Sequence, residues 1–314
     1  MGKVIRLIQR WFNMAAGKSA VAVEQGMGRC FRKDEIRGYY NDLTGKVSPA
    51  TLLDEQGVPY NIASSGQKVY SLVTISQYAL GCYDLFLLRE ERAYLERFLK
   101  LAERILDSQQ DDGKWDARQS IGSKLGNSSC MAQGQGCSIL LRAYLVNHDE
   151  RYRLGAEKAI RFMLRPTMEG GTAVYCGHDV TLEKYPPQDG CSSSVLNGWI
   201  FALFGLYDFI LFSGSEDCRI IWERSCRTLE QALPRYDRKY WSNYDLIGTI
   251  ASPAYNRVHV SLLLALSQLS GSEVFSAYAA RFDRYSKSRW NTIRAVLRKT
   301  VQKLTTPADA FLVQ

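Results

Sequence analysis

One pattern recurs four times between residues 69 and 286, and it limits the folds that this chain can adopt. Each pass begins with a helix that is apolar nearly all round, continues through a short polar break, and ends with a helix that carries charge on one face. Helices of the first kind need protein on all sides, whereas helices of the second kind can face water. The paired ranges are 69–88 with 95–108, 131–146 with 153–164, 195–212 with 220–233, and 258–269 with 276–286. This alternation is expected when inner helices line a ring and outer helices surround it.

We therefore expect a fold dominated by α-helices, an (α/α) toroid or incomplete barrel of helical hairpins. Three segments between the hairpins, 110–129, 169–194 and 235–257, are rich in Gly, Pro and Tyr and are too long to be simple connectors. Long loops at one end of a scaffold usually carry function, so the active site is expected there. The same segments can also form short antiparallel β-hairpins, and the two interpretations do not exclude each other.

The chain divides by composition into a toroid and two terminal parts. The expected boundaries are 1–65 for an N-terminal segment that wraps the toroid, 66–288 for the toroid itself, and 289–314 for a basic C-terminal helix and tail. Both terminal parts contain a basic amphipathic helix, marked by Lys3, Arg6 and Arg10 at one end and by residues 289–304 with Trp290 at the other. Such helices can lie on anionic membranes, but packing of the apolar face on the protein body is the more common arrangement.

Charge and cysteine usage narrow the classes of partner and cofactor. A formal net charge of +8 over 314 residues favours polyanions, which could be nucleic acid, anionic lipid or an acidic glycan. The basic residues are dispersed and no nucleic-acid-binding module is recognisable, so no nucleic-acid partner is expected. The eight cysteines have neither zinc-site nor paired spacing, and we expect no metal and no organic cofactor.

We expect neither a targeting segment nor a membrane-spanning helix in this sequence. Its first residues lack a long apolar stretch followed by a small-residue cleavage site, so a cytoplasmic location is expected. The most apolar stretch, residues 199–212, is too short to span a bilayer and includes Asp208. It is therefore interpreted as a buried core helix.

Several motifs together resemble one family of carbohydrate enzymes. They are MAQGQGCSILLRAYL at 131–145, GHDVTLEKYP at 177–186, SSVLNGWIFALFGLYD at 193–208, NYDL at 243–246 and SPAYNRVHVSLL at 252–263, with a further similar stretch at 64–81. Each motif falls at a hairpin start or in a loop between hairpins. In this order they resemble the C-terminal catalytic domain of the glucuronyl C5-epimerases, which invert C5 of D-glucuronate to L-iduronate within an anionic polysaccharide of the heparosan type.

The resemblance carries three catalytic tyrosines onto Tyr185, Tyr244 and Tyr255. The same motifs and their neighbours supply the expected substrate-binding residues, which are His178, Glu183, Lys184, Asn197, Arg257, His259, Gln133 and Trp241. Two positions depart from the animal enzymes. Lys184 stands where they have an acidic residue, and Ile247-Gly248 stands where they have Arg-His. The resemblance further implies capsule or exopolysaccharide assembly, with a polysaccharide or lipid-linked glycan as substrate and peripheral contact with the inner membrane; a homodimer is left open.

The chemistry explains why tyrosines and cations would be needed. Removing the proton at C5, which lies alpha to a carboxylate, builds further negative charge that donors such as Lys184, Asn197, Arg257 and His259 could neutralise. Inversion also needs an acid-base group on each face of the sugar, and a tyrosine can serve if nearby positive charge lowers its pKa. We expect Tyr185 and Tyr255 to flank C5 and Tyr244 to assist as a proton relay. His259 and Glu183 are competing bases.

Secondary roles and rival functions stay open at this point. Trp241, three residues before Tyr244, is the better candidate for stacking on a sugar than Trp199, which is expected in the core. Gln133 lies in a Gly-rich helix start that serves close packing or contacts a substrate hydroxyl. A polysaccharide lyase acting by β-elimination would need much the same site. A glycan-binding protein without catalysis is the other alternative.

Overall fold

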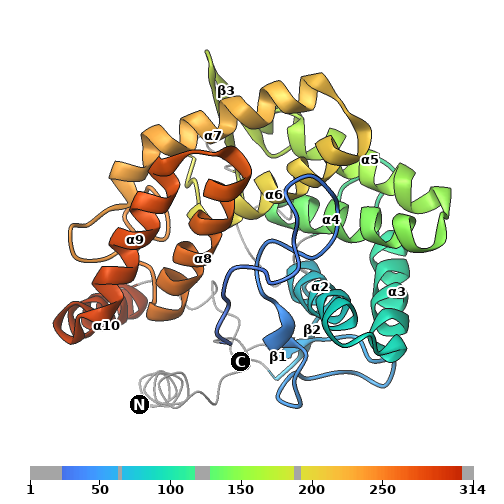
Figure 1. The fold of residues 1–314 in the computed structure, drawn as a ribbon. Helices are drawn as coiled ribbons and strands as arrows, with labels where there is room; N and C mark the ends of the chain where they lie inside the picture. Colours follow the sequence, from blue (N-terminus) through green and yellow to red (C-terminus); the bar gives the residue numbers. More distant parts are fainter. Residues whose placement is uncertain (1–22, 63–65, 117–127, 187–191, 306–314) are drawn as a thin grey trace.

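The helical hairpins expected from the sequence are present in the computed structural model, which describes residues 23–62, 66–116, 128–186 and 192–305. The hairpins are α2 (Leu72–Arg89) with α3 (Arg92–Asp107), α4 (Cys130–Asn147) with α5 (Glu150–Leu164), α6 (Leu196–Ser213) with α7 (Glu216–Tyr236), and α8 (Pro253–Ser270) with α9 (Glu273–Lys287). A further helix, α10 (Arg289–Thr305), follows α9. Figure 1 shows the hairpins arranged as an arc from α2 and α3 to α8, α9 and α10. The predicted fold class is confirmed.

The four inner helices share one length and one type of ending. α2, α4, α6 and α8 each contain 18 residues, and each is closed by a residue in the left-handed region. That residue is Gly214 or Gly271 in the last two hairpins but Glu90 or His148 in the first two. Its backbone N–H returns to the last turn of the helix, which satisfies one of the free carbonyls there. The chain then reverses into the outer helix after two residues.

Glycines allow the inner helices to approach closely. Gly134 of α4 faces Gly205 of α6, and a Cβ atom on Gly205 would lie 2.2 Å from the carbonyl oxygen of Gly134. Gly136 lies about half a turn further along α4. The ring of Trp115 packs against it, and a Cβ atom added to Gly136 would lie 2.6 Å from that ring. Close packing is therefore the role of the Gly-rich start of α4, one of the two alternatives that its sequence leaves open.

Tyr39 and Tyr40, which precede the first hairpin, hydrogen-bond two of the inner helices. The backbone N–H of Tyr39 donates to Asp84 of α2 at 2.9 Å, and the Tyr40 hydroxyl donates to Asp208 of α6 at 2.7 Å. Arg142 of α4 pairs with Asp208 at 2.6 Å, with both side chains fully buried. Asp84, Arg142 and Asp208 occupy the same place in their helices, five residues before the end. The segment thus ties three inner helices together, as expected for a wrapping element; the three-part division itself stays a prediction.

Short β-hairpins occupy loops of the scaffold. β3 (Ala173–Cys176) and β4 (Asp179–Leu182) pair antiparallel in the loop between α5 and α6. β1 (Asn61–Ile62) and β2 (Lys68–Val69) pair before α2, and short 3-10 helices cover Thr44–Lys46 and Thr167–Glu169. In the loop between α7 and α8, isolated bridges join Asp237 to Ser242 and Asn243 to Ile250. These elements shape the loops that precede the inner helices.

One helix in the described ranges, α6, is long and apolar enough by length and composition to cross a membrane. Within the fold, 78% of that window is buried, and its Asp208 is paired with Arg142. α6 packs mainly on α4 and also contacts α7 and α8. This is the environment of a core helix. The basic amphipathic helix expected near the N-terminus and the tail after Thr305 lie outside the described residues.

Candidate functional site

Three tyrosines from two loops and one helix start lie together where inner helices begin. Tyr185 follows β4, Tyr244 lies in the loop between α7 and α8, and Tyr255 stands in the first turn of α8. The rings of Tyr244 and Tyr255 meet edge to face with their centroids 5.0 Å apart. The phenol of Tyr244 is also hydrogen-bonded with that of Tyr185. Tyr255 is 38% exposed, so the cluster opens to solvent at that residue.

Lys184 supplies the positive charge at the centre of this group. Its ammonium donates a hydrogen bond to the Tyr244 hydroxyl at 2.9 Å and lies 5.4 Å from the ring centroids of both Tyr185 and Tyr244. The side chain is only 7% exposed. Its stem lies against Gly198 of α6, where an added Cβ would be 2.6 Å from the Cβ of Lys184. A glycine at position 198 is therefore required for the lysine to reach the tyrosines.

The protonation of Tyr244 differs from the expectation that positive charge would lower the pKa of these phenols. Burial raises the pKa of Tyr244 well above its ordinary value, and the neighbouring Tyr185 and Tyr255 and the hydrogen bond with Tyr185 add to the rise. Desolvation thus dominates at this residue. Tyr244 stays a neutral phenol, suited to donating or passing on a proton and not to acting as a resident phenolate.

Backbone hydrogen bonds fix the loop that carries Tyr244. Its N–H donates to the carbonyl of Thr249 at 2.7 Å, and its own carbonyl accepts from Leu196, the first residue of α6, at 3.0 Å. The next loop begins α8 with Ser252 as N-cap, whose hydroxyl accepts from the N–H of Tyr255 at 3.3 Å, and Pro253 takes the first helical position. The start of α8 therefore sets the position of Tyr255, while the start of α6 holds Tyr244.

Glu183 acts as an anchor beneath the site. Its carboxylate is fully buried and accepts from the hydroxyls of Ser192 and Ser194 and from the backbone N–H of Ser194. Its backbone links β4 to the rest of the loop and to the start of α4, through Thr172 and Cys130. Both carboxylate oxygens are occupied in this way. The geometry gives Glu183 the task of placing Lys184 and Tyr185, and not that of a base.

A chain of hydrogen bonds defines the tautomer of His259. Asn256 directs its amide N–H to the carbonyl of Phe282 at 3.1 Å, so its oxygen accepts the single hydroxyl proton of Ser242 at 2.7 Å. Ser242 must then accept from Nδ1–H of His259 at 3.0 Å. Burial, together with the charge of Lys184, lowers the pKa of His259 to about 3, so the ring is neutral and its Nε2 carries a free lone pair.

Two buried acceptors beside Lys184 lack a partner. They are Nε2 of His259 and Oδ1 of Asn197, neither of which has a hydrogen-bond partner in the described part of the chain. Asn197 precedes Gly198, which contacts the lysine stem, and Lys184 is near enough to His259 to lower its pKa. Buried acceptors are normally satisfied. These two atoms are suited to accept hydrogen bonds from the hydroxyls of a bound ligand.

Two expected substrate-binding residues are engaged in the protein interior. Trp241 is 1% exposed and donates its indole N–H to the carbonyl of Ala251 at 2.9 Å, so it is not available to stack on a sugar. The side-chain amide of Gln133 binds the loop before α4, donating to the Gly113 carbonyl at 2.9 Å and accepting from the Trp115 N–H at 3.3 Å. Both residues support the loops around the site and do not face it.

Two other expected residues are exposed. His178 lies at the tip of the β3–β4 hairpin, where its carbonyl and that of Gly177 accept from Arg224 of α7. Figure 1 shows this hairpin projecting outward beside α7, away from α8, so His178 is not brought to the tyrosines. Arg257 lies on α8 two residues after Tyr255 with its side chain in solvent. It is close to the cluster along the helix and remains the exposed cation nearest to Tyr255 in sequence.

The last helix contributes residues that the sequence did not single out. Lys299 of α10 donates to the Ile250 carbonyl at 2.8 Å, and its ammonium lies 5.8 Å from the centroid of the Tyr244 ring. Burial lowers the pKa of Lys299 to about 8, with the charge of Asp245 opposing the change. Gln302 donates to the Gly248 carbonyl and accepts from the Ile250 N–H. The basic pattern of α10 indicated a surface helix, and nothing in it marked the residues that hold this loop.

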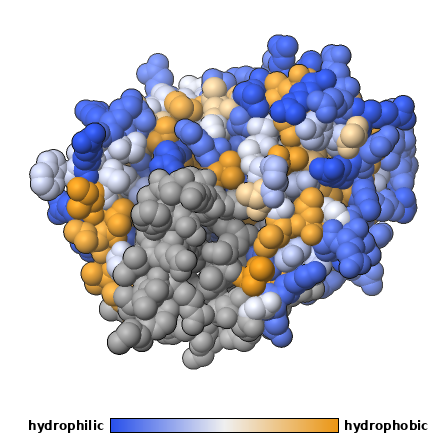
Figure 2. Space-filling model, turned by 90° about the horizontal axis from the view of Figure 1, so that it is seen from below, coloured by the Kyte–Doolittle hydropathy of each residue, from blue (hydrophilic) through white to orange (hydrophobic). Residues whose placement is uncertain are grey.

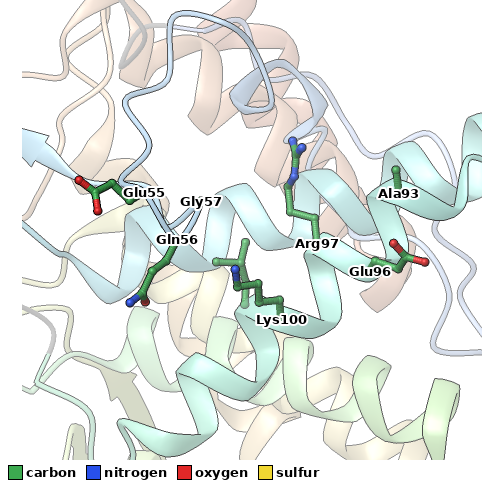
Figure 3. A pocket seen from close by; sticks show the side chains of 8 residues that line it. Glu55, Gln56, Gly57, Ala93, Glu96, Arg97 and Lys100 are labelled. Atoms are coloured by element: carbon green, nitrogen blue, oxygen red, sulfur yellow. The ribbon is translucent and has the colours of Figure 1, made fainter.

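A surface depression on another face of the described residues gathers no such chemistry. A surface depression of about 440 Å³ lies between the 55–57 turn and α3, and is lined by Glu55, Gln56, Gly57, Ala93, Glu96, Arg97, Lys100 and Leu101. Figure 3 shows its charged side chains spread along the rim without converging on a point. Within the described ranges there is no group of three or more His, Cys, Asp or Glu residues able to hold a metal ion.

Comparison with known proteins indicates the same family as the motifs. The family described as D-glucuronyl C5-epimerase C-terminus matches residues 109–284. A D-glucuronyl C5-epimerase of Caenorhabditis elegans is 30% identical over 224 residues, covering 63% of this chain and 36% of that enzyme. The chain thus spans about a third of that relative. An uncharacterized protein of Methanocaldococcus jannaschii is 26% identical over 268 residues, covering 76% of this chain and 79% of that protein.

Solved structures support the fold. A cellobiose 2-epimerase from Spirochaeta thermophila has a TM-score of 0.52 at 12% identity, covering 74% of this chain and 64% of its own. A GH76 alpha-mannanase from Bacteroides thetaiotaomicron has a TM-score of 0.53 at 10% identity, covering 80% and 76%. Both are α/α toroid enzymes, and at these identities the likeness concerns the architecture alone.

Proposed function

Because the chain belongs to the D-glucuronyl C5-epimerase C-terminal family, we propose that it is a carbohydrate epimerase that converts D-glucuronate residues to L-iduronate within an anionic polysaccharide. The observation that carries this proposal is the grouping of Tyr185, Tyr244 and Tyr255, with the buried ammonium of Lys184 against Tyr185 and Tyr244. Phenols can exchange protons with carbon, and a cation among them can balance the charge that builds up on the substrate. The reaction class needs both.

The first half of the reaction removes the proton from C5. A tyrosine in its phenolate form takes that proton, and the electron pair of the C5–H bond moves into an enolate that includes the carboxylate carbon. The developing charge lies on the carboxylate oxygens. Lys184 is placed to stabilise it, because a buried ammonium acts more strongly there than it would in water. We propose that Arg257, an exposed cation on α8, binds a neighbouring acidic sugar of the polymer.

The second half returns a proton to the opposite face of C5. A neutral tyrosine on that face donates its proton, becomes the phenolate, and leaves the inverted sugar. We assign the two faces to Tyr185 and Tyr255, since each contacts Tyr244 from a different element. Asn197 and His259 offer acceptors for sugar hydroxyls. These hydrogen bonds would hold the sugar ring in place while the configuration at C5 is inverted.

Inversion leaves the two tyrosines with their protonation states exchanged. Another D-glucuronate can react only after a proton has moved back from one phenol to the other. Tyr244 lies in contact with both, is hydrogen-bonded with Tyr185, and stays protonated because its pKa is raised. It is therefore suited to relay that proton within the site. This argument gives Tyr244 a role in turnover that differs from the role of the flanking pair.

The test measures deuterium at C5. The protein is incubated with a glucuronate polysaccharide such as heparosan in deuterated water, and NMR follows label at C5 and the appearance of iduronate. Tyr185→Phe and Tyr255→Phe should each abolish the formation of iduronate, and the variant that lacks the base on the reacting face of D-glucuronate should also lose exchange at C5. Tyr94→Phe is the matched control, because its hydroxyl contacts Arg89 on the exposed face of the scaffold. Thermal unfolding checks that each variant is folded. Retained exchange in both site variants would remove these tyrosines from the mechanism.

The same experiment separates the alternative functions. A lyase would lose the C4 substituent after abstraction, giving an unsaturated uronate that absorbs ultraviolet light and a shorter polymer. A glycan-binding protein would bind the polymer with no label at C5. A role in capsule or exopolysaccharide assembly on the cytoplasmic side of a membrane would follow if polymers or lipid-linked glycans of this class are the substrates.

A further inference from the structure

Helix α10 is fastened to the protein by one face. Ala295 is fully buried and packs in a small cluster with Trp241 and Ile250. Lys299 and Gln302 hydrogen-bond the backbone of the loop between α7 and α8. These contacts fix the rotation of the helix about its own axis. Whatever the opposite face carries is therefore held toward solvent.

The opposite face carries an unbroken apolar stripe. Its members recur every three or four residues and are all at least half exposed, which places them on one side of the helix. They are Trp290 (81% exposed), Ile293 (51%), Leu297 (63%), Val301 (60%) and Leu304 (50%). The fifteen residues from Trp290 to Leu304 extend the stripe over roughly 21 Å. Figure 2 shows hydrophobic side chains gathered along the edge of the molecule where Figure 1 places α10.

The charges on α10 itself have one sign. The α10 sequence contains five Arg or Lys residues and no Asp or Glu. Arg289, Arg294 and Arg298 are exposed on it, and Arg284 is exposed near the end of α9, where Lys287 is paired with Asp283 at 2.7 Å. A face that joins exposed apolar side chains to cations alone is typical of helices that lie in the surface of an anionic membrane.

We propose that α10 docks this protein on an anionic lipid surface, with its stripe in the headgroup region and its arginines on the lipid phosphates. The charge decides against a second copy of the chain as the occupant. Pairing two α10 helices would bring their like charges together, whereas an anionic bilayer complements them, at about fivefold in affinity for each basic residue near the surface. Because α10 also holds the loop of Tyr244, docking would place the tyrosine cluster beside the membrane. The proposal does not depend on the reaction at the site.

The test is sedimentation of the full chain with vesicles. Vesicles of phosphatidylcholine with phosphatidylglycerol should bind the protein, and vesicles of phosphatidylcholine alone should bind it far less. Added salt should weaken binding, because exposed charges are screened. Ile293→Gln with Leu297→Gln should reduce binding by at least tenfold, and Arg298→Glu by about twentyfold, since it changes two charges. Leu154→Gln is the matched control, because Leu154 is an exposed leucine on α5.

Several results would overturn the proposal. Absence of binding to anionic vesicles, or equal binding by the Ile293→Gln/Leu297→Gln variant, would exclude α10 as the docking surface. A dimer of the native chain that the same double variant dissociates, together with no vesicle binding, would assign the stripe to a second copy. The substituted side chains are exposed, so the variants should fold, and circular dichroism checks this directly.

Discussion

Replacing Lys184 with methionine should reduce the rate of C5 exchange by about 10²–10³-fold with little change in stability. The ammonium is the charged donor at 2.9 Å from the Tyr244 hydroxyl and lies 5.4 Å from the ring centroids of Tyr185 and Tyr244. Removing a single donor that stabilises developing negative charge costs about 2.7–4 kcal/mol in other enzymes, which corresponds to this loss of rate. Methionine keeps a stem of similar length against Gly198 and removes a buried charge, so the free energy of unfolding should change by only about 1 kcal/mol.

The assay follows deuterium incorporation at C5 by NMR over a range of substrate concentrations. If Lys184 stabilises the enolate, kcat falls; if it only binds the carboxylate of the ground state, KM rises and kcat is kept. Lys100→Met on α3 is the control, because Lys100 lies in the surface depression of Figure 3. An exchange rate within threefold of the native protein would refute the central role of Lys184.

Three further predictions concern packing, pH and the C-terminal helix. Gly205→Ala places a Cβ 2.2 Å from the Gly134 carbonyl and should destabilise the fold by about 1–3 kcal/mol, measured as a lower Tm. Burial raises the pKa of Asp84 to about 7, so its contribution to stability is full below about pH 4 and is lost as pH rises to about 7; Asp84→Asn should remove this slope in urea unfolding at pH 5 and 8. Lys299→Met loses the hydrogen bond to the Ile250 carbonyl and so loosens the loop of Tyr244; it should lower kcat for C5 exchange by about tenfold and the free energy of unfolding by about 1 kcal/mol, with KM nearly unchanged.

The hairpins could be predicted because the physical reason for them is local. An inner helix surrounded by protein has to be apolar on every side, and the periodicity of the sequence records this directly. The C-terminal ends of the inner helices could be predicted in part, since Gly214 and Gly271 mark two of the four left-handed residues that end them. Glu90 and His148 close the other two without such a signal. Which glycines meet across helices, as Gly134 and Gly205 do, depends on the crossing of the helices and has no local signature.

The site could be predicted only as far as motifs report position along the chain. Trp241 illustrates the limit, because it lies three residues from Tyr244 in sequence. A bridge between Asp237 and Ser242 turns the chain just there, and the indole packs inward against Ile250 and Ala251. Adjacency in a loop says nothing about which side of the loop a side chain occupies. The residues of α10 were missed for the complementary reason, since they reach the loop from about fifty positions away.

The upward shift of the Tyr244 pKa shows why the protonation states of this site could not be predicted from its residue types alone. A nearby cation lowers the pKa of a phenol, and burial raises it; each effect amounts to several kcal/mol in a protein interior. The sequence supplies the cation, Lys184, but not the burial, and burial prevails at Tyr244. A phenol that keeps its proton cannot begin the reaction as a base. If Tyr185 and Tyr255 flank C5 as we propose, Tyr244 can return a proton from one of them to the other, and its burial would then support repeated inversion in one direction.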